Sequence, residues 1–280
     1  MRNILITGVS TGIGLHLTKI FIHRGYRVFG SVRKRCDALP LANEFGDRFH
    51  ALIFDVTDHA AIHDAFEKVK IMVKNEGLAG LINNAGIAIN GTVMHTTIAQ
   101  YQKQFDVNFF GLIAVTKAFL PLLGAVKNYP LEPGKIINIS SVSGKIALPF
   151  LSPYCTSKFA TEAFSDALRR EMLPYGIDVI TIGPGPVATP IWKKSSELSV
   201  EILESDYGPV IAPFQRHLEK SIKNAMKPDI LASKIFDVFV KKKPKTRYTF
   251  VYNKFFNYYI PRYLLTPRQL DKIIAKMFRF

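Results

Sequence analysis

The chain has 280 residues, a length that suits one large domain better than two. Apolar residues make up 48% of it and charged residues 21%, values that exclude both an intrinsically disordered chain and a membrane-embedded helical bundle. The formal net charge of +15 suits an anionic membrane surface, a nucleic acid or a phosphorylated cofactor, and it does not by itself choose among them.

The predicted elements alternate between short β-branched strands and longer amphipathic helices. In chain order, strands are expected over residues 3–7, 27–31, 49–54, 80–83, 135–140, 178–182 and 247–251, and helices over 12–24, 60–75, 98–119, 157–175 and 229–241. This alternation is typical of repeated βαβ units. We therefore expect an α/β fold: a single Rossmann-type, doubly wound domain whose mostly parallel sheet of about seven strands is flanked by helices, with ligands at the carboxyl ends of the strands.

Three features bear on the compartment and on metal binding. The first strand begins almost at the first residue and leaves no room for a secretion signal, so we expect a cytoplasmic protein. The two cysteines, Cys36 and Cys155, are too few for a disulfide framework or a metal cluster, and no metal site is predicted. The longest apolar stretch, residues 109–126, is interrupted by Lys117 and Pro121, which favours a buried core helix over a membrane span.

A glycine-rich turn joins the first strand to the first helix. It has the spacing Gly-x-x-x-Gly-x-Gly, and its candidate cofactor contacts are Gly8, Ser10, Thr11, Gly12, Ile13 and Gly14. Glycines let the backbone approach a pyrophosphate that lies on a helix N-terminus. The commoner dinucleotide fingerprint is Gly-x-Gly-x-x-Gly, so a purely structural turn stays open as the alternative.

The end of the second strand indicates which nicotinamide cofactor is bound. Arg33, Lys34 and Arg35 stand where an NAD enzyme would carry an acid for the ribose hydroxyls. The guanidinium of Arg33, assisted by Lys34, suits the oxygens of a 2′-phosphate. NADP(H) is therefore favoured over NAD(H), against the alternative of a solvated basic turn.

Two further strand ends supply candidate cofactor contacts. Asp55 and Val56 follow the third strand, where a side chain could bond the adenine amino group, although Asp55 could equally cap a turn or helix. Asn84, Ala85 and Gly86 follow the fourth strand, where small residues would let the chain pass close to the cofactor ribose while an amide braces neighbouring strands. A plain turn is the alternative here.

Tyr154 and Lys158 lie four residues apart at the start of a helical segment and therefore project from the same helix face. A phenol is a poor base near neutral pH, but a nearby ammonium stabilises the phenolate and lowers the phenol's pKa. We therefore expect Lys158 to lower the pKa of Tyr154. Tyr154 could then exchange a proton with a substrate hydroxyl while hydride moves between substrate and nicotinamide.

Two other polar residues could serve the same site. Ser141, at the end of the fifth strand, could bond the substrate oxygen and steady its developing charge. Asn108 lies inside a helical pattern, where its amide could hold a water that connects Lys158 to solvent. Taken singly, each has an ordinary alternative: Tyr154 as a helix-start aromatic, Lys158 as a solvated charge, Ser141 as a loop hydroxyl and Asn108 as an irregular helix position.

In combination these motifs resemble the short-chain dehydrogenase/reductase family, and the steroid and retinoid branches in particular. Thr-Gly-x-x-x-Gly-x-Gly, Asn-Asn-Ala-Gly, a downstream Asn, a Ser and Tyr-x-x-x-Lys occur in the family's order, over a length that reaches about Val251. The resemblance implies a catalytic tetrad of Asn108, Ser141, Tyr154 and Lys158, with Lys158 also binding the nicotinamide ribose. Ser140 and Ser143 are alternative serines, and the family's usual spacing to the tyrosine favours Ser141.

The resemblance also covers the segment after the sixth strand and the outer helices. Pro184, Val187 and Thr189 match the family's Pro-Gly segment, which implies that they hold the nicotinamide carboxamide; as sequence alone the segment is a rigid turn. Relatives commonly assemble through helices that match residues 108–123 and 157–175. A homodimer or homotetramer is implied by that likeness alone.

Residues from about 190 to 227 break the alternation and are too many for a plain loop, which predicts a substrate lid with short helices. The lid's apolar residues are Ile191, Trp192, Leu198, Ile202, Leu203, Tyr207, Val210, Ile211 and Phe214. They either line a cavity for a bulky lipophilic alcohol or ketone or simply pack the lid onto the sheet. The resemblance to the steroid and retinoid branches favours a lipophilic substrate of the steroid, retinoid or lipid kind.

Residues 254–280 form a basic, aromatic extension beyond a catalytic domain of residues 1–253. Aromatic residues mixed with cations are typical of a helix that lies on a membrane surface, and a peripheral membrane contact is one interpretation. The favoured alternative is a helix packed on the domain or on a second subunit. Nucleic acid is not expected as a partner, because no recognition motif accompanies the charge.

The sequence therefore predicts an NADP(H)-dependent oxidoreductase that interconverts an alcohol and a ketone or aldehyde, with Tyr154 as acid and base. One alternative is a non-catalytic NADP-binding regulatory protein, which would have no need of Tyr154 with Lys158. The other is an epimerase or dehydratase of the same superfamily, which the chain length and the lack of a separate sugar-binding domain disfavour.

Overall fold

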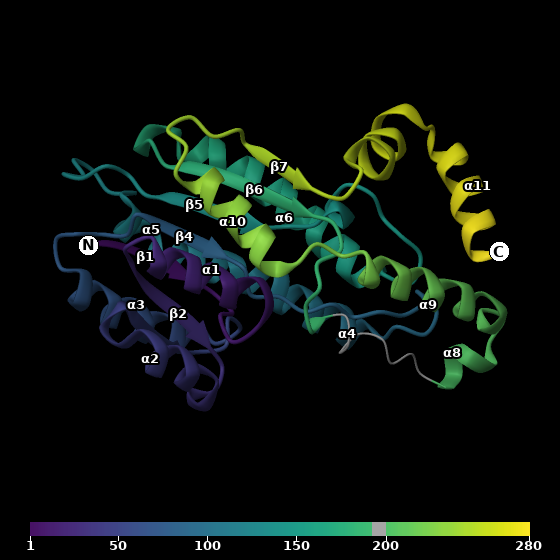
Figure 1. Ribbon diagram of the computed structural model, residues 1–280, viewed down its shortest axis with the longest axis horizontal. Helices are drawn as coiled ribbons and strands as arrows, with labels where there is room; N and C mark the ends of the chain where they lie inside the picture. The colour runs from purple at the N-terminus through teal and green to yellow at the C-terminus, as the bar shows by residue number, and fades with distance from the viewer. Residues whose placement is uncertain (192–199) are drawn as a thin grey trace.

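The computed structural model describes residues 1–191 and 200–280 (Figure 1). Seven strands form one parallel sheet in the order β3-β2-β1-β4-β5-β6-β7. The strands are β1 (Arg2–Ile6), β2 (Tyr26–Val32), β3 (Phe49–Ile53), β4 (Gly80–Asn83), β5 (Lys135–Ile139), β6 (Asp178–Pro184) and β7 (Arg247–Phe250). The predicted fold class is confirmed, and the chain reverses its direction across the sheet between β1 and β4, where doubly wound folds bind ligands.

Helices cover both faces of the sheet. The helices are α1 (Gly12–His23), α2 (Leu39–Phe45), α3 (His59–Val73), α4 (Ile98–Phe105), α5 (Gly111–Leu123), α6 (Ser152–Glu171), α8 (Val200–Glu204), α9 (Gly208–Lys223), α10 (Pro228–Phe239) and α11 (Pro267–Phe278). Side chains alternate across a strand, so Ile4 and Ile6 of β1 join a core with α1 and α10, whereas Leu5 joins the core with α3, α5 and α6.

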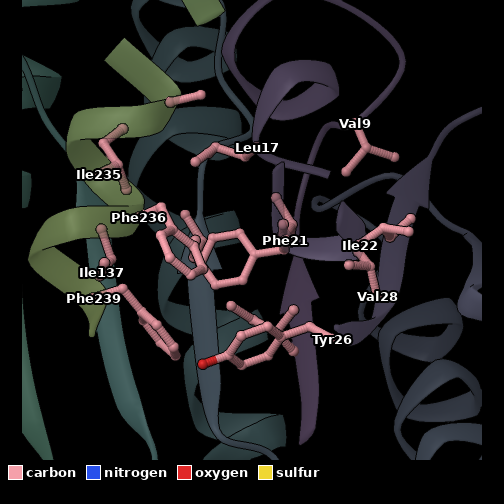
Figure 2. Close-up of a cluster of buried hydrophobic side chains, with 14 of the residues drawn as sticks. Val9, Leu17, Phe21, Ile22, Tyr26, Val28, Ile137, Ile235, Phe236 and Phe239 are labelled. Atoms are coloured by element: carbon pink, nitrogen blue, oxygen red, sulfur yellow. The ribbon is translucent and has the colours of Figure 1, made fainter. Parts of the chain in front are cut away.

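Aromatic rings form the centre of the core on the α1 and α10 side. The ring of Phe21 on α1 meets those of Tyr26, Phe236 and Phe239 edge to face, with centroids 5.0 to 5.2 Å apart (Figure 2). Each such pair adds roughly 0.5–1.5 kcal/mol beyond the burial of its area. This packing fixes α1, and with it the glycine turn that precedes α1.

The helix predicted over residues 98–119 is divided in the structure. A π-helical turn, η3 (Asp106–Phe110), lies between α4 and α5. Residues 98–123 are long and apolar enough to cross a membrane by length and composition alone. Val115, Phe119 and Leu123 are fully buried against the sheet, so the segment is a core helix here, as its sequence favoured.

The helix predicted over residues 157–175 begins earlier and ends earlier than expected. α6 starts at Ser152 and has a proline in its first turn. Backbone N–H groups in the first turn have no partner within the helix, so proline, which lacks this group, costs no hydrogen bond there. It ends at Glu171 and is followed by a 3-10 turn over Leu173–Tyr175. Tyr154 and Lys158 therefore occupy successive turns at the N-terminal end of one continuous helix.

The C-terminal extension packs on this chain, which is the alternative that we favoured. It consists of a π-helix, η6 (Phe255–Leu264), and α11, whose start is set by a capping box between Thr266 and Gln269. Phe278 of α11 is fully buried, and its ring lies 5.7 Å from that of Phe214 on α9. Figure 1 shows α11, in yellow, beside the green α9.

Candidate active site

The glycine turn has the shape that a dinucleotide requires. Gly8 and Gly12 have φ angles of +70° and +59°, in the left-handed region that favours glycine. A Cβ on Gly14 would lie 2.2 Å from the carbonyl oxygen of Gly8. No side chain caps the N-terminus of α1 at Thr11, so its backbone N–H groups are available to phosphate oxygens. These residues fit a pyrophosphate.

The amide of Asn84 braces the first and fourth strands. Its Nδ2 donates to the carbonyl oxygens of Thr7 and Gly8 at 2.9 and 3.0 Å. In return, Oγ1 of Thr7 accepts from the backbone N–H groups of Asn84 and Ala85, both at 2.9 Å. The side chain of Asn84 therefore holds the glycine turn, and the backbone of residues 84–86 is what faces the cofactor region.

One large cavity of about 1850 Å³ runs along the carboxyl ends of the strands. Most of the residues predicted from the sequence line it: Gly8, Ser10, Thr11, Gly12, Ile13, Arg33, Asp55, Val56, Asn84, Ala85, Gly86, Ser141, Tyr154, Lys158, Pro184, Val187 and Thr189. Gly14 and Asn108 are not among its lining residues and lie behind its wall. The cavity is long enough to join the cofactor loops to the lid and the C-terminal extension.

Arg33 supplies a cation at the end of the cavity near β2, which Asp37 and Asp55 also line. Arg33 is exposed there, and no carboxylate in the described part of the chain pairs with it. Cys36 and Asp37 line the same end, although the sequence pattern gave no signal for them. The Asp55 carboxylate accepts from the backbone N–H and hydroxyl of Thr57 at 3.0 and 2.9 Å, so it both closes a turn and faces the cavity.

Tyr154, Ser141 and Lys158 come together in the middle of the cavity. Ser141 lies two residues after the end of β5 and caps a 3-10 turn over Val142–Gly144, where its hydroxyl accepts the backbone N–H of Ser143 at 3.0 Å. The same hydroxyl hydrogen-bonds the Tyr154 phenol. The Lys158 Nζ donates to the carbonyl oxygen of Ile139 at 2.8 Å and lies 5.8 Å from the centroid of the Tyr154 ring. Both side chains are buried.

Burial controls the charge states of this pair. It raises the pKa of Tyr154 to about 12, and the hydrogen bond from Ser141 only partly opposes the rise. Burial also lowers the pKa of Lys158 to about 8, against the attraction of the Glu162 carboxylate. The net lowering of the Tyr154 pKa that we expected is therefore not found in the protein without cofactor, because burial of the phenol raises that pKa by more than the hydrogen bond with Ser141 lowers it. At neutral pH, Tyr154 is a phenol that can donate a proton.

Asn108 lies in the π-helical turn η3, and its amide is fully used within the protein. Its Nδ2 donates to the carbonyl oxygen of Ile87 at 3.0 Å and to Oγ of Ser157 at 3.2 Å, while its Oδ1 accepts the N–H of Ile87 at 2.8 Å. The side chain thus ties the loop after β4 to the residue beside Lys158. Single π-turns are frequent at functional sites, where they redirect a side chain.

The segment after β6 packs against both the glycine turn and the end of the lid. A Cβ on Gly12 would lie 3.1 Å from the Thr189 methyl group. The backbone N–H of Ala188 donates to the carbonyl oxygen of Met226 at 3.0 Å, and the N–H of Met226 donates to Pro186 at 3.0 Å. Thr189 therefore stands over the entrance to α1, beside the cofactor loops.

The lid residues divide between two roles. Ile191 and Phe214 line the cavity, whereas Ile202, Val210 and Ile211 do not. These three residues are buried in a cluster with Phe150 and Phe278, to which Phe214 also belongs. Tyr207 packs against that cluster and Leu203 is half exposed, while Trp192 and Leu198 lie outside the described residues. α9 is also longer than the short helices expected for the lid.

Much of the cavity's apolar wall comes from residues that the sequence interpretation did not assign to it. α9 adds Leu218 and Ile222, and the C-terminal extension adds Ile260, Leu265, Leu270, Ile274 and Met277. Their helical spacing was visible in the sequence, but the cavity they face was not. The extension therefore completes the site, in addition to packing on the lid.

The comparisons with known proteins agree with this geometry. The family model described as short chain dehydrogenase matches residues 2–199. The chain belongs to the short-chain dehydrogenase/reductase family. It is accordingly an oxidoreductase that acts on CH–OH groups with a nicotinamide cofactor.

This short-chain dehydrogenase/reductase is similar to two known proteins in sequence and to one solved structure in fold. It is 40% identical to an NADPH-dependent 3-dehydrocapnine reductase from Ornithobacterium rhinotracheale, over 99% of this chain and 97% of the relative. It is 39% identical to human retinol dehydrogenase 5 over 67% of this chain and 57% of that protein. A short-chain dehydrogenase from Streptomyces avermitilis has the same fold, with a TM-score of 0.78, 24% identity and coverage of 99% of this chain and 95% of that one.

Proposed function

We propose that this protein is a reductase that converts the ketone of a long, lipophilic substrate to an alcohol with NADPH, and that 3-dehydrocapnine is its leading candidate substrate. The observation that carries the proposal is the buried Tyr154, which is hydrogen-bonded to Ser141 in a cavity whose far wall is apolar. A phenol at this position is an acid ready to protonate a carbonyl oxygen. The 40% identity to the 3-dehydrocapnine reductase over nearly both full lengths supports the choice of substrate.

The residues of this chain would divide the chemistry as follows. Bound NADPH supplies the hydride to the carbonyl carbon. Tyr154 donates a hydrogen bond to the carbonyl oxygen and then its proton, while Ser141 steadies the charge that develops on that oxygen. Lys158, held at the carbonyl of Ile139, faces the Tyr154 ring and stabilises the phenolate left behind. A hydrogen bond from Asn108 holds Ser157, the residue before Lys158, in place.

NADP(H) is the cofactor that both the site and the relative favour. Arg33 is exposed at the β2 end of the cavity with no paired carboxylate in the described residues, and its guanidinium suits a 2′-phosphate. The 40% identical relative is NADPH-dependent. Pro184, Val187 and Thr189 line the cavity beside the glycine turn, where they would meet the nicotinamide carboxamide.

Replacing Arg33 should change cofactor preference without stopping turnover. In Arg33→Ser the 2′-phosphate loses a charge-assisted bond, so KM for NADPH should rise about tenfold to a hundredfold while KM for NADH stays unchanged. Initial rates with each cofactor test this, and Arg35→Ser, an exposed neighbour that does not line the cavity, should behave like the wild type. Equal effects of Arg33→Ser on both cofactors would contradict the assignment.

A substrate panel tests the proposed function directly. NADPH oxidation should be measured with 3-dehydrocapnine, a ketosteroid, retinal and a short keto sugar at matched concentrations. The apolar wall formed by Leu218, Ile222 and Ile274 predicts turnover of 3-dehydrocapnine and none of the sugar. Activity confined to the sugar would overturn the lipophilic substrate.

We further propose that the C-terminal extension lets the protein rest on an anionic membrane. Its exposed apolar side chains are Phe255, Phe256, Tyr259, Tyr263, Leu264, Ile273, Met277 and Phe280, and its exposed cations include Arg262, Arg268, Lys272, Lys276 and Arg279. Apolar rings among cations suit the boundary between acyl chains and anionic headgroups. Because η6 and α11 also line the cavity, this placement would bring the site close to a lipid substrate.

Vesicle binding tests the membrane contact. Leu264 is 64% exposed and does not line the cavity, so Leu264→Ser should weaken sedimentation with phosphatidylglycerol vesicles and leave the fold intact. Added salt should weaken it further. Ile71→Ser on α3, where the side chain is 71% exposed, is the matched control. A contact through the extension would be rejected if Leu264→Ser and Ile71→Ser lost vesicle binding equally, or if neither variant lost it.

The assembly and compartment stay predictions. Phe110 and Phe159 are 51% and 42% exposed on the helices through which relatives commonly assemble. Such apolar residues suit a homodimer or homotetramer. A cytoplasmic location, with the extension at a membrane surface, is the location most consistent with this proposal.

A further inference from the structure

A buried carboxylate lies one helical turn beyond Lys158. Glu162 is 5% exposed, and its spacing of four residues places it on the same face of α6 as Lys158. Its oxygens accept from Arg247 Nε at 2.9 and 3.2 Å and from Arg247 Nη2 at 3.1 Å, and Lys145 Nζ lies 3.4 Å away. A buried charge is costly unless it is paired, and a bidentate guanidinium is the strongest such partner.

Arg247 connects this carboxylate to the candidate catalytic serine and to the C-terminal extension. The side chain extends from β7 across Gly183 of β6, where a Cβ would lie 2.3 Å from Nη2. Nη1 donates to the phenol oxygen of the buried Tyr258 in η6 at 3.1 Å. Nη2 lies 3.5 Å from the backbone carbonyl oxygen of Ser141. One guanidinium thus contacts α6, the turn that follows β5 and the C-terminal extension.

The groups around Lys158 explain why the position of Glu162 matters. Tyr154 and Glu162 share its helix, Lys145 follows the 3-10 turn after Ser141, Arg247 lies on β7, and Tyr258 and Cys155 complete the titratable groups nearby. Among these described groups Glu162 alone carries a carboxylate. Its negative charge favours the ammonium form of Lys158, whereas burial favours the neutral amine. Without it, Lys158 would face mainly cations and phenols.

We propose that Glu162, fixed by Arg247, is a positioning residue that keeps Lys158 in its ammonium form beside Tyr154. Through Arg247 it also holds the backbone of Ser141 in place relative to Lys158 and Tyr154. The inference rests on the proposed function, because it assigns a role to groups that act through Lys158 and Tyr154. It also gives the C-terminal extension a second connection to the site, through Tyr258.

The test is the pH dependence of kcat in variants that preserve the packing. Glu162→Gln is the informative variant, because it removes one charge while Arg247, which is 19% exposed, keeps its hydrogen bond to Tyr258. Glu162→Gln/Arg247→Gln removes one negative and one positive charge together, so it should move the pH profile much less. The alkaline limb of the kcat profile of Glu162→Gln should move to lower pH. At pH 8, kcat should fall about fivefold, because lowering a Lys158 pKa of about 8 by one unit reduces the ammonium fraction from about one half to about one eleventh. Glu162→Asp keeps the charge and should keep the limb in place.

Two controls separate this result from other effects. Asp166→Asn removes a carboxylate from the exposed side of α6, where it pairs with Arg169, and should leave the limb unchanged. NADPH binding by fluorescence confirms that each variant is folded. An unshifted limb in folded Glu162→Gln, or an equal shift in Glu162→Asp, would overturn the inference. The proposed function would survive that result, because the substrate panel and Tyr154→Phe test it separately.

Discussion

Tyr154→Phe should lower kcat for NADPH-dependent ketone reduction by about a thousandfold, within the range of general-acid catalysis, and leave NADPH affinity unchanged. The substitution removes only the phenol oxygen. The ring stays buried beside Lys158, so packing and the cofactor loops are preserved. What is lost is the proton that would go to the carbonyl oxygen and the hydrogen bond with Ser141.

Steady-state rates on 3-dehydrocapnine, combined with NADPH fluorescence titration, measure both quantities. Tyr101→Phe is the matched control, because the Tyr101 phenol hydrogen-bonds Ser152 Oγ at 2.5 Å at the start of the same helix but does not line the cavity. It should keep nearly all of the wild-type kcat. A Tyr154→Phe protein that retained most of its turnover would show that another group protonates the substrate.

Gly14→Ala should weaken NADPH binding at least about tenfold and destabilise the fold by about 1–3 kcal/mol, the usual cost of overpacking. The new Cβ would lie 2.2 Å from the Gly8 carbonyl oxygen and 2.6 Å from Asn84 Nδ2. Neither group can move freely, since Asn84 braces β1 against β4. α1 must therefore shift away from the glycine turn, and its N-terminal N–H groups move with it.

Thermal unfolding and NADPH titration measure these two losses. Gly25→Ala provides the control: its φ is +85°, but nothing lies within 4 Å of a new Cβ. It should lose only the roughly 1 kcal/mol that a left-handed residue costs, and NADPH affinity should not change. If both variants weakened NADPH binding equally, close contact at Gly14 could not be the reason for a glycine there.

The sheet could be predicted because its strands are short β-branched runs separated by longer amphipathic helices, and the ordered motifs indicated the family. The helix bounds were less certain. The π-turn at Asn108 was not predicted, because residues 98–119 have one continuous amphipathic pattern and the partners of Asn108, Ile87 and Ser157, come from other elements. The early start of α6 had a signal in Pro153, since proline is common in the first turn of a helix.

Other parts of the site depend on contacts that no local pattern contains. Glu162 and Arg247 are 85 residues apart and meet only because β7 pairs with β6 beside α6. The pKa of Tyr154 depends on burial by the whole domain, so a spacing argument gave it the wrong direction. The spacing of Thr266 and Gln269 suits a capping box and could have indicated the start of α11, but no local pattern shows that Phe278 packs on Phe214.

Transfer of deuterium from NADPH to substrate tests the central claim most directly. Purified protein and 3-dehydrocapnine are incubated with NADPH that carries deuterium at both C4 positions of the nicotinamide ring, and the product is examined by mass spectrometry. We predict an alcohol with a single deuterium on the carbon that was the ketone, formed by the wild type and Tyr101→Phe and not by Tyr154→Phe. Failure of the wild type to label the product, or equal labelling by Tyr154→Phe, would contradict a tyrosine-dependent NADPH reductase.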